Sequence, residues 1–134
     1  MSARTMSIIM WTLSIIFGLL FILAGQPKLF GVSGVLEMFE NWGYPARFAH
    51  VVGLLEISGG IGLMIPRVSR HAAKLLLVVM LGAFVTHIFA SEWMRLINVA
   101  VFAGAVYTVM VLRNRQVPRA VEDAESNDAA AIAV

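Results

Sequence analysis

Four long runs of apolar residues, separated by short polar segments, dominate the pattern along the chain. They cover residues 6–24, 48–65, 72–90 and 96–112. Each run is close to the roughly 20 residues that a helix, rising 1.5 Å per residue, needs to cross a hydrocarbon core. The pattern therefore predicts an all-α integral membrane protein, with a bundle of four transmembrane helices in residues 1–115.

The first run has features of a secretory signal peptide, because Arg4 supplies a charged start. Its apolar stretch exceeds the usual length of about 7–15 residues and lacks an A-x-A ending. We therefore expect it to remain as a membrane span.

The connection between the first two spans, residues 25–46, has a pattern of its own. Apolar side chains recur at i, i+4 and i+7, and two acids occupy the opposite face, which is typical of an amphipathic helix. These residues are Val35, Phe39 and Trp42 on one face, and Glu37 and Glu40 on the other. We expect a short interfacial helix in the first external loop, either as a simple anchor or as a gate over a ligand. Nearby, Tyr44 and Trp93 suit the aromatic belt of a membrane boundary.

Composition supports a membrane protein and removes several kinds of chemistry. Hydrophobic residues make up 60% of the 134 residues and charged residues 13%, whereas soluble domains carry about 25% charged residues. The chain has no cysteine, which excludes disulfides, thiolate metal sites and CxxC redox chemistry within it. The basic residues lie beside the spans, so nucleic acid is not an expected partner, whereas the lipid bilayer is.

The distribution of basic residues predicts the orientation. Seven lie on the side of the termini, namely Arg4, Arg67, Arg70, Lys74, Arg113, Arg115 and Arg119, and three lie opposite, namely Lys28, Arg47 and Arg95. By the positive-inside rule both termini face the cytoplasm of a bacterial inner membrane. Residues 116–134 are acidic and alanine-rich, and we expect a disordered cytoplasmic tail.

Glu56 lies near the middle of the second span, where a charge costs about 2.5–3.5 kcal/mol on the gentler insertion scales. It must face the interior of the bundle, either protonated or held ionised by a cation. A proton-handling or ligand-orienting role and a purely structural role in helix packing are both open.

Two histidines lie at matching depths, each about one turn inside the external end of its span. His50 is on the second span and His87 on the third. Together they could line a pocket, relay protons, or bind a haem from both sides. No motif indicates a metal site, and a bond to a backbone carbonyl or a headgroup is the ordinary alternative.

Two further residues could join this external cluster. Lys28 follows Pro27 at the end of the first span, where a kink could aim its ammonium group at the pocket; reaching the headgroups is the alternative. Asn98, near the external end of the fourth span, could add an amide or bond across helices. The candidate ligand-binding or proton-handling residues are Glu56, His87, His50, Lys28 and Asn98.

Small residues recur at positions where helices could approach closely. They are Ser14, Gly18, Gly59, Gly60, Gly62, Gly82 and Thr86, with a stripe of Ala100, Gly104 and Thr108 on the fourth span. Such stripes build compact bundles, and they also mediate homo-oligomers or docking to a larger subunit.

Three segments resemble the DoxX-like family of small bacterial membrane proteins, over most of residues 8–112. They are AGQPKLF at residues 24–30, WGYPARFAHVVGLLEISGGIGLMIP at 42–66 and AAKLLLVVMLGAFVTHIF at 72–89. The resemblance implies a four-helix membrane bundle, and Lys28, Glu56 and His87 match the family pattern. Family names derive from a thiosulfate:quinone oxidoreductase subunit, and some relatives look like membrane anchors for redox partners. The lack of cysteine argues against direct thiol chemistry here.

These observations favour a redox-associated accessory or anchor component that binds a quinone or a similar lipid-like ligand beneath the external helix. Catalysis by this chain alone is not expected, because no nucleophile or metal constellation is visible; a larger membrane redox subunit is the expected partner. The alternative is a non-catalytic packing or assembly protein. A haem-binding subunit is less favoured, and so is a small transporter, since four spans show no inverted repeat.

Overall fold

The computed structural model describes residues 2–133, without the side chains of residues 117–120, and within them the chain forms five α-helices. These are α1 (Ala3–Leu29), α2 (Ser33–Asn41), α3 (Ala46–Met64), α4 (Ser69–Phe89) and α5 (Trp93–Ile132). Four of them, α1, α3, α4 and α5, are long and apolar enough to cross a membrane. The prediction of an all-α bundle with four membrane spans is confirmed.

The distribution of apolar side chains is that of a bundle in lipid rather than in water. Large side chains such as Leu23, Val78 and Leu81 are more than 60% exposed on the outer surface. Phe21, Leu76 and other residues between the helices are fully buried. Lipid tails are as apolar as leucine, so close packing rather than hydrophobicity must hold such helices together.

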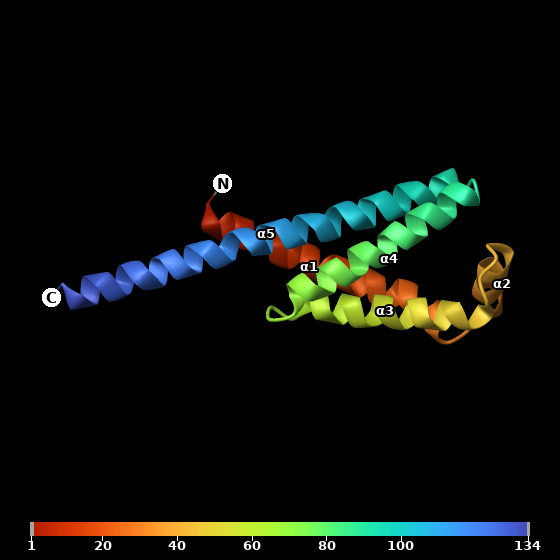
Figure 1. Ribbon diagram of the computed structural model, residues 1–134, viewed down its shortest axis with the longest axis horizontal. Helices are drawn as coiled ribbons and strands as arrows, with labels where there is room; N and C mark the ends of the chain where they lie inside the picture. The colour runs from red at the N-terminus through yellow and green to blue at the C-terminus, as the bar shows by residue number, and fades with distance from the viewer. Residues whose placement is uncertain (1, 134) are drawn as a thin grey trace.

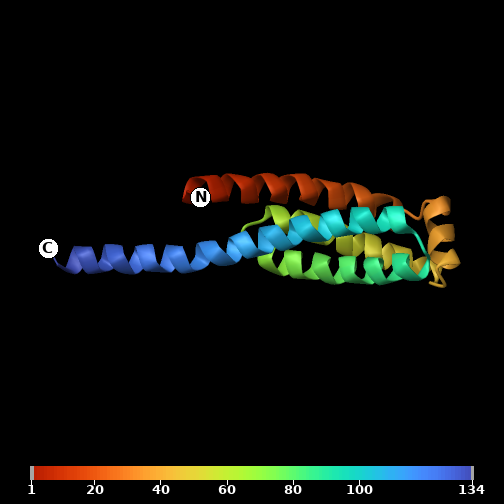
Figure 2. The ribbon, with the colours of Figure 1, turned by 90° about the horizontal axis from the view of Figure 1, so that it is seen from above.

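The helices form two antiparallel pairs that diverge toward one end of the bundle. α1 packs along α3, and α4 packs along α5, with further contacts between α3 and α4 and between α1 and α5. The short helix α2 lies across the end where the two pairs diverge, as Figure 1 and Figure 2 show. We call this the α2 end. Both chain termini point toward the opposite end.

The contact between α1 and α3 is close enough to require glycine. A Cβ atom on Gly53 would lie 2.6 Å from the backbone nitrogen of Leu29, and one on Gly60 would lie 2.5 Å from the carbonyl oxygen of Gly18. Real Cβ atoms essentially never approach backbone this closely, so the two backbones touch directly. By contrast, a Cβ on Gly104 would meet no atom within 4 Å. The small-residue stripe of α5 is therefore not used inside this chain.

The predicted amphipathic helix is confirmed as α2. Phe39 is 5% exposed and packs inward, whereas Glu37 and Glu40 are exposed on the opposite face. α2 crosses the end of the bundle (Figure 2), and its side chains Met38 and Phe39 line the pocket at this end.

The chain differs from the expected pattern at two helix ends. α1 continues past residue 24 to Leu29 with Pro27 in its last turns, which carries Lys28 on the helix itself. α5 continues to Ile132 and so includes the segment from residue 116 that is predicted to be a disordered tail. Val134 lies outside the described residues. The alanine and glutamate residues of this segment favour a helix. All residues from 121 to 133 are exposed, so this part of α5 packs against no other helix. The boundary of the membrane domain near residue 115 stays a prediction.

Candidate functional site

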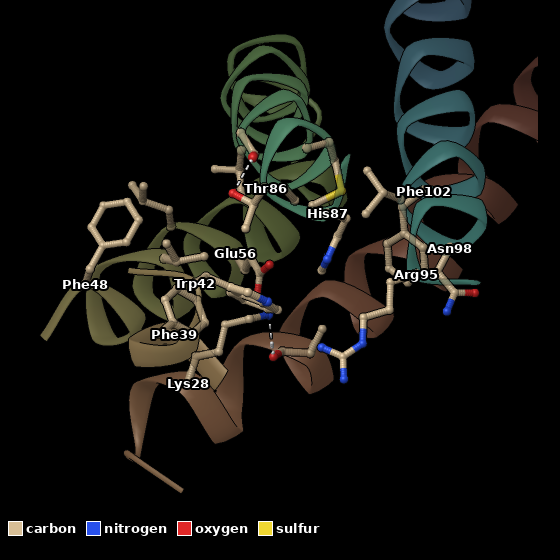
Figure 3. A pocket seen from close by; sticks show the side chains of 18 of the residues that line it. Lys28, Phe39, Trp42, Phe48, Glu56, Thr86, His87, Arg95, Asn98 and Phe102 are labelled. Atoms are coloured by element: carbon tan, nitrogen blue, oxygen red, sulfur yellow. Dashed lines mark hydrogen bonds and ion pairs between the residues drawn. The ribbon is translucent and has the colours of Figure 1, made fainter. Parts of the chain in front are cut away.

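A pocket of about 580 Å³ lies at the α2 end, between the diverging helix pairs and beneath α2. All five helices contribute to its lining, which is largely apolar and includes Phe21, Phe39, Met80 and Phe102 (Figure 3). The polar residues at its walls are Lys28, Tyr44, Glu56, Thr86, His87, Arg95 and Asn98. The volume falls within the roughly 300–1,000 Å³ that is usual for small-molecule sites.

An ion pair between α1 and α3 forms one wall of the pocket. The Nζ atom of Lys28 lies 2.6 Å from Oε2 of Glu56 and also donates to the carbonyl oxygen of Ala24, at 3.1 Å. Glu56 is 4% exposed. Pairing lowers the cost of placing each charge within the membrane, because a buried ion needs a partner and hydrogen bonds. The ammonium group turns back along its own helix toward the pocket rather than outward to the headgroups.

A second part of the wall is formed by His87 on α4 and groups from the start of α5. Nδ1 of His87 lies 2.7 Å from Oε2 of Glu92, and Arg95 lies 3.6 Å from Oε1 of the same carboxylate. Trp42 packs edge-on against the His87 ring, with centroids 5.2 Å apart. The guanidinium of Arg95 lies 5.8 Å from the centre of the Trp42 ring. These contacts hold the imidazole from two sides.

A third set of contacts joins α2 and the turn that follows it to the helices α4 and α5. The hydroxyl groups of Tyr44 and Thr86 are 2.9 Å apart, and Thr86 also donates to the carbonyl oxygen of Gly82. Arg95 donates to the sulfur of Met38 on α2, at 3.2 Å. The segment from α2 to the start of α3 is thus linked to both α4 and α5.

The structure separates the two histidines that the sequence places at one depth. His50 does not line the pocket; its Nδ1 lies 2.8 Å from the carbonyl oxygen of Leu29, and its ring lies beside Gly31. On a helix with 3.6 residues per turn, His50 is rotated by about 120° from Glu56. His50 therefore faces the end of α1, and the arrangement does not suit bis-histidine haem ligation. His50 thus makes the ordinary contact expected of a histidine near a helix end, a hydrogen bond to a backbone carbonyl.

The other four candidates, Lys28, Glu56, His87 and Asn98, all line this one pocket. Within residues 2–133, no group of three or more histidine and acidic side chains is arranged to hold a metal ion. The four side chains supply hydrogen-bonding and charged groups at the pocket wall.

The sequence pattern does not indicate four residues of the site. It relates Arg95 only to topology, Tyr44 only to the aromatic belt and Thr86 only to helix packing, and it gives Glu92 no role. A signal for Arg95 exists, since Arg95, Asn98 and Phe102 are spaced i, i+3 and i+7 and share the pocket face of α5. Glu92 has no such signal, because its position depends on the turn between α4 and α5.

Comparisons with known proteins agree with this architecture. The family model of the DoxX-like family matches residues 12–116. A protein of Bacillus subtilis (strain 168) named "Putative oxidoreductase CatD" is 28% identical over 74 residues, which are 55% of each chain. The match thus spans about half the length of that relative. No solved structure is significantly similar. With four apolar spanning helices and a family match over most of its length, this multi-pass membrane protein belongs to the DoxX-like family.

Proposed function

We propose that this protein is a redox-associated membrane component that binds a quinone or a similar lipid-like ligand in the pocket at the α2 end. The observation that carries the proposal is a largely apolar pocket with a lysine–glutamate pair and a glutamate-bound histidine at its wall. An apolar cavity with a few convergent polar groups is the usual form of a small-molecule site.

The polar groups suit a ring that carries two oxygen atoms. Lysine has three N–H donors, and two of those of Lys28 are used by Ala24 and Glu56. The third can meet one ring oxygen, while His87 or Asn98 can meet another. Aromatic side chains, among them Phe39 and Phe102, also line the pocket.

An accessory role fits this chemistry better than independent catalysis. The chain has no cysteine, which excludes thiol redox chemistry within it, and we infer that electrons reach the ligand from a partner. The name of the Bacillus subtilis relative as an oxidoreductase supports a redox setting. We infer that a larger membrane redox subunit is the partner.

Replacing Glu56 by glutamine tests the site. The amide is nearly isosteric and its oxygen can still accept a hydrogen bond from Lys28, whose side chain is 21% exposed, so the bundle should stay folded. Losing the charge that orients Lys28 should weaken ligand retention by about tenfold, the worth of one hydrogen bond to a charged group. The measurement is mass spectrometry of solvent extracts from the purified protein, with Glu40→Gln on the exposed face of α2 as the control. Equal retention by wild type and Glu56→Gln would remove Glu56 from the ligand site.

A second candidate, a packing or assembly protein, has one specific observation in its favour. The Lys28–Glu56 pair joins α1 to α3 beside Gly53, where the two helices touch. If the pair serves only packing, Glu56→Gln should lower stability, because it leaves the ammonium group of Lys28 without its ionised partner. The same preparation should then contain a stoichiometric protein partner and no ligand.

We also propose that both termini face the cytoplasm of the bacterial inner membrane. Seven basic residues lie on the side of the termini and three on the side of α2. The difference grows when the basic residues that make contacts inside the pocket are left out. Lys28 and Arg95 make pocket contacts, which leaves Arg47 as the remaining base at the α2 end. The positive-inside rule therefore favours an external α2.

The orientation predicts the behaviour of reporter fusions. Alkaline phosphatase, which folds only outside the cytoplasm, should be inactive when fused to the C-terminus and active when inserted after Gly43, in the turn that follows α2. A cytoplasmic fluorescent reporter should show the reverse pattern. The opposite activities would place the pocket in the inner leaflet instead of the outer one.

A further inference from the structure

The turn between α4 and α5 brings Glu92 back onto His87. Ser91 has a left-handed backbone conformation, with φ of 57°. The N–H of Ser91 donates to the carbonyl oxygen of Ile88, and that of Glu92 to the carbonyl oxygen of His87, at 3.1 and 3.0 Å. This pair of bonds is the Schellman motif, which ends a helix and reverses the chain. Residues 87 and 92 are therefore linked through both their backbones and their side chains.

The carboxylate determines which nitrogen of His87 carries a proton. An ionised carboxylate can only accept hydrogen bonds, so Nδ1 of His87 is the donor to Oε2 of Glu92. In a neutral imidazole the other nitrogen, Nε2, then has a free lone pair, as in carboxylate–histidine pairs generally. Arg95 beside Oε1 gives the carboxylate a cationic neighbour.

Nε2 is available to a molecule in the pocket. His87 lines the pocket, and no hydrogen bond to its Nε2 occurs within the part of the chain that the structure describes. The charged or titratable groups that share the pocket are Lys28 from α1, Tyr44 before α3, Glu56 from α3 and Arg95 from α5. Each of these has a partner of its own at the walls.

We propose that Glu92 is a positioning residue that makes His87 a hydrogen-bond acceptor, so that the pocket selects a ligand with a ring hydroxyl at this wall. The inference rests on the proposed function and deepens it, because it favours the hydroxylated, reduced form of a quinone-like ring, or another phenol-type amphiphile, over a ring with carbonyl groups alone. A hydroxyl group can donate to Nε2. A carbonyl oxygen cannot donate, and it would leave Nε2 without a partner.

The first test concerns the histidine without any ligand. In protein labelled with ¹⁵N-histidine, NMR should show the His87 ring with its proton on Nδ1, the signal being assigned by its loss in His87→Phe. Glu92→Gln should change this signature, because an amide can donate to Nδ1 as well as accept from it. Glu40→Gln is the matched control and should leave the spectrum unchanged. A His87 ring protonated on Nε2 in the wild type would overturn the proposal.

The second test compares two probes, of which only one has a hydroxyl donor; the other carries a methyl group in place of the hydroxyl hydrogen. Purified protein in nanodiscs is titrated with 4-hexylphenol and with 4-hexylanisole, its methyl ether. The wild type should prefer the phenol by about tenfold more than His87→Phe or Glu92→Gln does, the worth of one hydrogen bond to a well-placed acceptor. Comparing variants cancels the different partitioning of the probes into lipid. The same preference in wild type and both variants would overturn the proposal.

Decylubiquinone, which has carbonyl groups but no ring hydroxyl, separates this inference from the proposed function. If decylubiquinone binds in the pocket while the phenol preference is absent, only the selection of a hydroxyl fails. If neither decylubiquinone nor 4-hexylphenol binds, the proposed function fails and this inference fails with it. Thermal melts of each variant show that a loss of binding does not reflect unfolding.

Discussion

Gly53→Ala should lower the free energy of unfolding by about 2–3 kcal/mol, at the upper end of the cost of overpacking a close contact. The added methyl group would lie 2.6 Å from the nitrogen of Leu29 and 2.7 Å from the carbonyl oxygen of Gly25. Both atoms belong to the backbone of α1, so neither can rotate away, and α1 must move as a whole. The measurement is a detergent unfolding titration followed by circular dichroism.

Gly104→Ala is the matched control for this change. A Cβ at residue 104 would meet no atom within 4 Å, so its effect should stay within about 0.5 kcal/mol. Gly53→Ala should also weaken ligand retention, because the methyl group would lie 2.9 Å from Cβ of Lys28. Equal stability of the two alanine variants would contradict the close contact between α1 and α3.

Lys28→Met should destabilise the protein by about 3 kcal/mol, the lower part of the range for removing one partner of a buried ion pair. The change leaves the carboxylate of Glu56, 4% exposed, without its cation. The lower figure applies because the side chain of Lys28 remains 21% exposed and because Glu56 can take up a proton. Thermal melts in detergent provide the measurement.

A second substitution shows whether the loss of stability arises from the Glu56 carboxylate that is left without a cation. Lys28→Met combined with Glu56→Gln should recover most of the stability, since it removes both charges; groups in direct contact show coupling of about 0.5–3 kcal/mol. Lys74→Met, at an exposed position on α4, should change stability by less than about 0.5 kcal/mol. Additive effects of the two pocket substitutions would mean that Lys28 and Glu56 do not interact as the structure shows.

The sequence alone predicts the fold to a large extent, because a bilayer allows few solutions. A run of about 20 apolar residues can satisfy its backbone in lipid only as a helix or within a closed barrel. Four such runs therefore predict four spanning helices, and the confirmed family follows from the same segments. The amphipathic spacing of Val35, Phe39 and Trp42 likewise predicts α2 from local chemistry alone.

The depth of a polar group can also be read from the sequence, but its direction cannot. His50 and His87 lie at similar depths in their spans, yet only His87 enters the pocket. Depth follows from counting residues along one helix at 1.5 Å each. Direction depends on which face each helix turns to its neighbours, and that is decided by contacts such as the one at Gly53.

The sequence by itself thus determined the spans, the interfacial helix and the presence of a buried acid that must face the bundle. Only the tertiary structure decided which groups meet. It pairs Glu56 with Lys28, which is 28 residues away. It also places Arg95, which the sequence relates only to topology, in the pocket wall. It also brings Glu92 onto His87 through a left-handed Ser91. Such pairings depend on helix rotation and turn geometry, which arise from the packing of all the helices at once rather than from the pattern of any one segment.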